Sequence, residues 1–111
     1  MHMEICTSQT SEIINLASDE NVNLVKKEKM LIDLFSMYES LPENHPFKNR
    51  YFACVIHVLL VLFIINKRCF NFTLRLLLRL LKDGRITLQT YREIIAQLII
   101  GGVSPIEIDI L

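Results

Sequence analysis

Glycine and proline are scarce in this 111-residue chain, with only three of each. An all-β fold needs many tight turns, and these two residues supply most of them. Hydrophobic residues make up 51% of the chain, which favours burial in a folded core over disorder. At this length, two separate cores would each lie near the lower limit for independent folding. We therefore expect one helical domain over residues 11–111, preceded by a polar, poorly ordered segment at residues 1–10.

Cysteine is also scarce and odd in number, which argues against a disulfide scaffold. Cys54 and Cys69 stand in strongly apolar segments, where a free thiol behaves as a small core residue. A metal site is suggested by three residues of the types that bind zinc, Cys54, His57 and Cys69. Structural zinc, however, needs a fourth ligand, and the sequence offers none nearby. We expect two core thiols, a core histidine, no metal and no cofactor. No cationic N-terminal region leads into an apolar one, so we expect no secretory signal and a cytoplasmic location.

The motifs of common catalytic sites are missing as well. The chain has no glycine-rich phosphate loop, no nucleophile elbow, no paired metal-binding histidines and no histidine beside grouped carboxylates. We therefore predict that the protein is not an enzyme.

Acidic residues are unevenly distributed, although the net charge is zero. Residues 1–47 hold eight acidic and three basic residues, whereas residues 48–92 hold nine basic residues and only Asp83. Residues 93–111 add three acidic residues. Such segregation indicates that one part of the chain covers another, or that a charged surface is open to a partner.

Hydrophobic spacing predicts an all-α bundle of four main helices with short elements at both ends. The helices are expected at residues 20–41, 46–65, 71–82 and 87–100. Two prolines, Pro42 and Pro46, separate the first pair. From Tyr51 to Ile65 only His57 interrupts the apolar character, so we expect the second helix to lie at the centre of the bundle. The 15 residues from Tyr51 to Ile65 are too few to span a membrane, because about 20 apolar residues are needed.

Residues that cap helices define the second half of the chain. Asn71 or Thr73 can begin the third helix, and Thr87 can begin the fourth. Gly84 is expected to end the third helix in a left-handed conformation, and Gly101 to end the fourth. A marginal helix is expected at residues 11–17. After residue 104, a capping box predicts a short helix, while the alternation of Ile106, Ile108 and Ile110 fits a strand.

The core is expected to combine the apolar second helix with the inner faces of its neighbours. The residues predicted to be buried together are Val55, Leu59, Leu62, Phe63, Leu77, Leu80, Tyr91, Ile95 and Leu98. On the third helix, a spacing of about 100° per residue places its cations in one narrow stripe. The candidate partner-binding residues, named here the basic stripe, are Arg68, Arg75, Arg79, Lys82 and Arg85.

We predict a small protein-protein interaction factor, such as an adaptor, chaperone, immunity or regulatory protein. It would bind a protein partner through an apolar and charge-segregated helical surface, and we expect a homodimer. One alternative is a membrane-associated protein with a hydrophobic hairpin at residues 47–82. A second is a small DNA-binding regulator in which Arg85 and Arg92 face phosphates. We favour neither the membrane nor a nucleic acid as the partner, because the third helix is apolar almost all round and no aromatic residues interleave with its cations.

Overall fold

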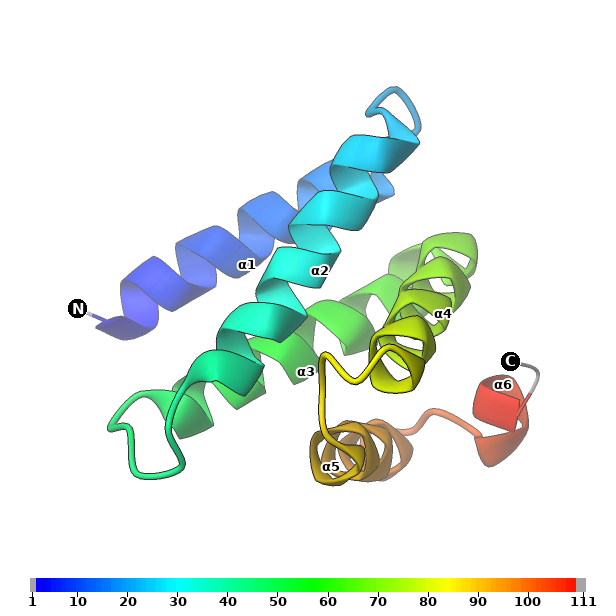
Figure 1. Cartoon of the computed structure of the whole chain (residues 1–111). Helices are drawn as coiled ribbons and strands as arrows, with labels where there is room; N and C mark the ends of the chain where they lie inside the picture. Colours follow the sequence, from blue (N-terminus) through cyan, green and yellow to red (C-terminus); the bar gives the residue numbers. More distant parts are fainter. Residues whose placement is uncertain (1, 110–111) are drawn as a thin grey trace.

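Six α-helices make up the computed structural model, which describes residues 2–109 and the side chains of residues 9–108 (Figure 1). In chain order they are α1 (His2–Ser18), α2 (Leu24–Ser40), α3 (Lys48–Ile65), α4 (Lys67–Lys82), α5 (Leu88–Ile100) and α6 (Pro105–Asp109). Over residues 2–109 there is no strand. The predicted all-α bundle is therefore confirmed.

The helices are arranged around α3, which contacts α1, α2, α4 and α5. In Figure 1, α1 and α2 run in opposite directions, and α3 lies behind α2. Only Asn66 separates α3 from α4, so the chain reverses sharply there. Helix α5 crosses below α3, and α6 follows it near the C-terminal end of the described chain.

Helix α1 is longer than the sequence predicted, since it begins at His2 and not near residue 11. Residues 2–10, expected to be poorly ordered, belong to this helix. Its inner side is buried at Thr10, Ile14 and Ala17, and it packs along α3. Contact with another helix therefore supports a segment whose own hydrophobic pattern is weak.

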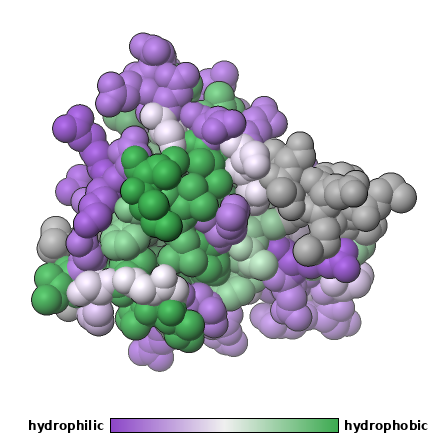
Figure 2. Space-filling model, turned by 180° about the vertical axis from the view of Figure 1, so that it is seen from behind, coloured by the Kyte–Doolittle hydropathy of each residue, from purple (hydrophilic) through white to green (hydrophobic). Residues whose placement is uncertain are grey.

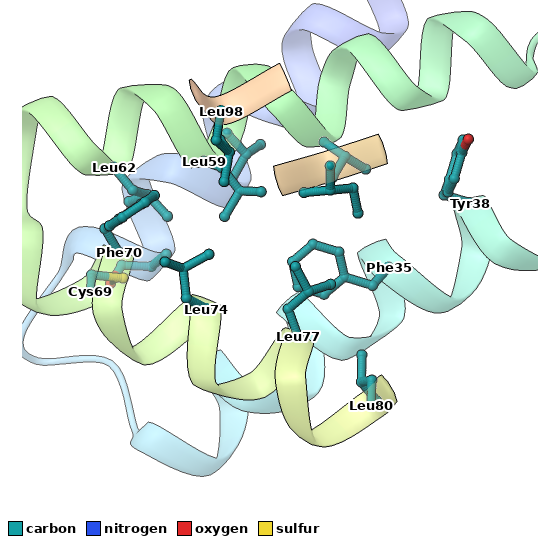
Figure 3. Close-up of a cluster of buried hydrophobic side chains, with 14 of the residues drawn as sticks. Phe35, Tyr38, Leu59, Leu62, Cys69, Phe70, Leu74, Leu77, Leu80 and Leu98 are labelled. Carbon is teal, nitrogen blue, oxygen red and sulfur yellow. Dashed lines mark hydrogen bonds between the residues drawn. The ribbon is translucent and has the colours of Figure 1, made fainter. Parts of the chain in front are cut away.

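The core lies where α2, α3, α4 and α5 meet (Figure 3). Leu59 and Leu62 of α3 point toward Leu74 and Leu77 of α4, and Phe35 of α2 lies beside Leu77. Six of the nine predicted core residues are buried, but three are only partly buried. Those three are Phe63, Tyr91 and Ile95. On α5, Leu98 is buried as predicted, and its buried companions are Thr90 and Ile94, so the buried stripe is rotated relative to the expected register.

Helix α3 is not enclosed as its composition suggested. It buries one face, and its opposite face is exposed at Ala53, His57 and Ile64. The expected core histidine is therefore exposed. A helix without a polar face carries no signal for which side should be covered, so its neighbours decide.

Two glycines end helices in left-handed conformations, Gly84 with φ +75° and Gly102 with φ +106°. After α4, the Arg85 amide donates to the Leu80 carbonyl at 2.9 Å, which satisfies an end carbonyl of the helix. The prediction for Gly84 is confirmed. Helix α5 ends at the C-cap Gly101, as predicted, and the left-handed residue is the next one, Gly102. Gly101 instead allows close packing, because a Cβ there would lie 2.9 Å from both Leu60 methyl carbons.

The predicted N-cap is correct for α5 and wrong for α4. The Thr87 side chain caps α5 by accepting from the Thr90 amide at 3.1 Å, as predicted. Helix α4 begins four residues early, and its cap is Asn66, not Asn71 or Thr73. The Asn66 side chain accepts from the Cys69 amide at 3.1 Å. After Ser104, the helical alternative holds over residues 105–109, while Ile110 lies outside the described residues.

The cysteines correct a further expectation. Cys69 is a free, buried thiol, as predicted, and it donates to the Ala17 carbonyl at 3.2 Å. Cys54 is disulfide-bonded, so the expectation of two core thiols was wrong. Disulfide formation depends on which residues the fold brings together, and an odd cysteine count leaves room for one bond.

Candidate functional site

All five residues of the basic stripe are exposed, as a binding role requires. One of them is already engaged within the chain, because the Arg79 guanidinium forms an ion pair with the Glu28 carboxylate of α2. Acidic α2 therefore covers part of basic α4 in the same molecule. The segregated charges of the sequence are thus partly used inside the fold.

The remaining stripe residues lie in two places. Arg68 and Arg75 line a hollow of about 720 Å³ between the start of α2 and the start of α4, and Lys27 of α2 lies on its other side. We call it the basic hollow. Its full lining is Glu20, Leu24, Lys27, Asn66, Arg68, Cys69, Phe72 and Arg75. Lys82, at the far end of α4, and Arg85, in the turn after it, are outside this lining.

An exposed apolar surface that the sequence did not predict is formed by the ends of three helices. We call this surface the isoleucine patch. It consists of Ile64, Ile65, Ile99, Ile100 and Ile106. Ile64 is 79% exposed, Ile100 76% and Ile106 72%. Soluble proteins rarely leave many large apolar side chains open together unless they bind something.

Contacts between distant parts of the chain bring together the helix termini that carry these isoleucines. Gly101 packs on Leu60 of α3, so the end of α5 lies one helical turn from Ile64. Lys67 donates to Glu107 at 3.3 Å, so α6 lies beside the residue that follows Ile65 and Asn66. Figure 2 shows the molecule from behind, and apolar surface crosses the middle of this face.

A signal for this patch is present in the sequence. Two isoleucine doublets, Ile64-Ile65 and Ile99-Ile100, end their helices. Adjacent helical residues point about 100° apart, so both members of a doublet cannot face one narrow core contact. Their gathering in space depends on the tertiary contacts of Leu60 and Lys67.

A second apolar surface is the groove between α1 and α2, with a volume of about 540 Å³. Its apolar lining is Ile13, Leu16, Met30, Leu34, Met37 and Tyr51. Charged and polar residues border it, including Glu12, Lys26 and Asp33. Met37 is 50% exposed, so part of the groove wall is open to solvent.

Polar contacts at the end of α2 hold this framework in position. The buried Lys48 ammonium donates to the Leu41 carbonyl at 2.7 Å and to the Tyr38 carbonyl at 3.3 Å. It also lies 4.5 Å from the centre of the Tyr38 ring. Glu39 accepts from the Thr87 amide at 2.9 Å and from the Thr90 hydroxyl at 2.5 Å. These groups are therefore structural, because their partners are helix ends.

Among the described residues, two side chains have a shifted pKa. Burial raises the pKa of Tyr38 above its ordinary value, and the charges of Glu93, Glu43 and Glu39 raise it further. Burial also raises the pKa of the Cys69 thiol, while the hydrogen bond with Thr73 and the charge of Lys27 oppose that rise. A buried thiol of this kind is a poor nucleophile.

The residues considered for a metal site are not arranged as ligands. Cys54 is disulfide-bonded, His57 is exposed, and the Cys69 thiol donates to a backbone carbonyl. In the part of the chain that the structure describes, no group of three or more His, Cys, Asp or Glu side chains could hold a metal ion.

Comparison with protein-family models, with curated proteins and with solved structures finds no match to this chain.

Proposed function

We propose that this protein is a non-enzymatic interaction factor that binds a protein through the isoleucine patch, with a second copy of the chain as the partner. The observation that carries the proposal is the exposure of the patch, above all Ile64 at 79% and Ile100 at 76%. Leaving these side chains in water is unfavourable, and covering them would contribute to binding.

Two properties of the patch favour a second copy. In a two-fold symmetric dimer the same surface meets itself, and an apolar patch is complementary to itself. The border of the patch carries Lys67 and Glu107, which form an ion pair within one chain, so this pair leaves no uncompensated charge to repel a second copy. The Arg79–Glu28 pair uses charges within one chain, so the apolar surface supports the dimer better than the overall charge map does.

Sedimentation equilibrium over micromolar concentrations tests the proposal. We expect the parent protein to dimerise and the variants Ile64→Glu and Ile100→Glu to be monomeric at the same concentrations. Met37→Glu, on the exposed wall of the α1–α2 groove, is the matched control and should still dimerise. A parent protein that stays monomeric, or a dimer lost only in the Met37 variant, would contradict the role of the patch.

Membrane association is the second candidate, and a specific observation favours it. Helix α3 has a mean hydropathy of 1.7 over 18 residues, and only 28% of them are buried. Among the described residues it is the one helix whose length and composition would allow it to cross a membrane. Flotation with liposomes after purification without detergent tests this function. A protein that stays at the bottom of the gradient is not membrane-associated under those conditions.

Location is part of the proposal and can be tested through Cys54. A cytoplasmic location is the expectation from the sequence, whereas a disulfide is typical of oxidising compartments. Alkylation of the protein in its native cells, followed by mass spectrometry, would show whether Cys54 is oxidised there. An oxidised Cys54 would contradict the cytoplasmic location.

A further inference from the structure

The basic hollow holds three cations whose charges are not neutralised by neighbours. Arg68 and Arg75 of α4 and Lys27 of α2 line it, and none of their side chains forms an ion pair or hydrogen bond with the described residues. Arg79, one turn beyond Arg75, shows the contrast, because Glu28 neutralises it. Glu20 is the only carboxylate among the described lining residues, whose cations outnumber it three to one.

The start of α4 adds to this positive potential. Asn66 and Cys69, at the cap and in the first turn of this 16-residue helix, belong to the lining. The N-terminal end of a helix carries partial positive charge and free amide donors, which favour anions. Arginine side chains and a helix N-terminus together are the groups that commonly bind phosphate.

We propose that the basic hollow binds a small anion that carries two or more phosphate groups. Three cations on two helices fit a ligand with several negatively charged groups better than a ligand with one. A volume of about 720 Å³ also exceeds what one phosphate fills. Phe72 and the 61% exposed Leu24 add apolar wall, which an organic part of the ligand would contact. This site is separate from the isoleucine patch, so the inference does not depend on the proposed function.

Isothermal titration calorimetry with inorganic tripolyphosphate tests the site. The double variant Arg68→Gln/Arg75→Gln should raise the dissociation constant by about tenfold or more, since charge-assisted hydrogen bonds are lost. The matched control is Lys82→Gln/Arg85→Gln, which removes the same charge from the far end of α4. Its dissociation constant should stay within about twofold of the parent value, because distant exposed charges are screened by salt.

ATP, titrated in parallel, distinguishes two sources of the phosphate groups. Equal affinities for ATP and tripolyphosphate would support a site that reads phosphate alone. Tighter binding of ATP would support the site and assign a contact to Phe72 and Leu24. Lys27→Gln provides a single variant on the opposite wall, and it should weaken both probes. Thermal melts by circular dichroism would confirm that each variant is folded.

Two outcomes would overturn the proposal. The first is the absence of binding by both probes at millimolar concentration in low salt. The second is an equal loss of affinity in the two double variants, since that would show attraction by net charge without a defined site.

Discussion

Helices α3 and α4 are neighbours in the chain, joined only by Asn66, but they bury their surfaces differently. Helix α4 buries seven of its 16 residues and exposes its arginines. Helix α3 is the more apolar of the two, yet it buries only five of its 18 residues. The less apolar helix is therefore the better covered one.

The difference shows what a polar pattern contributes to a fold. Burying an unpaired charge is costly, so Arg75 and Arg79 determine which side of α4 faces solvent. Helix α3 has no such constraint beyond its first turn, and several of its faces could have been buried. Its open side, together with the ends of α5 and α6, becomes the isoleucine patch.

The two faces of α3 should differ most in their effect on stability. Leu59→Ala and Leu62→Ala, both fully buried, should lower the free energy of unfolding by about 2–5 kcal/mol. Ile64→Ala, on the exposed face of the same helix, should change it by no more than about 0.5 kcal/mol in the monomer. Urea unfolding measures both. Losses under about 1 kcal/mol at both leucines would contradict the burial of this face.

A substitution of Lys48, the first residue of α3, should have a smaller effect on the free energy of unfolding. Lys48→Met leaves the Tyr38 and Leu41 carbonyls without their donor, so we expect a loss of about 1–3 kcal/mol in unfolding free energy. Lys82→Met, at the exposed end of α4, is the control and should be neutral within about 0.5 kcal/mol. Equal stabilities of the two variants would mean that Lys48 does not hold the end of α2.

The turn after α4 tests a purely conformational contribution. A Cβ at Gly84 would meet no atom within 4 Å, so only its left-handed backbone opposes a side chain. Gly84→Val should therefore cost about 1–2 kcal/mol. Asp83→Val, next to it at φ −80°, needs no such conformation and should cost less. Thermal melts of the two variants compare them, and a smaller loss at Gly84 would contradict the assignment.

The smallest expected effect is a shift in the pKa of Tyr38, near the end of α2. Because burial raises the pKa of Tyr38, its protonated form contributes stability that is fully present below about pH 10. That stability is lost as the pH rises through the folded-state pKa. The difference in tyrosinate absorbance between the parent and Tyr38→Phe should have its midpoint above pH 10. A midpoint at or below the ordinary tyrosine value would mean that Tyr38 is exposed to solvent.

Much of the fold could be predicted because it follows from local chemistry. The caps and turns at Thr87 and Gly84 depend on residues within one turn of each other, and both predictions are confirmed. The exposure of the basic stripe follows from the charge pattern of α4. The length of α1 could not be predicted, because it depends on packing against a helix more than 30 residues away.

The candidate sites show the same division. The doublets Ile64-Ile65 and Ile99-Ile100 and the cations Arg68 and Arg75 are visible in the printed chain. Nothing local places an end of α5 on Leu60, pairs Arg79 with Glu28, or sets Lys27 opposite Arg75. Helix type, turns and the direction of charged faces are short-range properties and can be read from spacing. Which apolar face is covered, and which cations stay unpaired, depends on long-range packing, so only the assembled fold decides them.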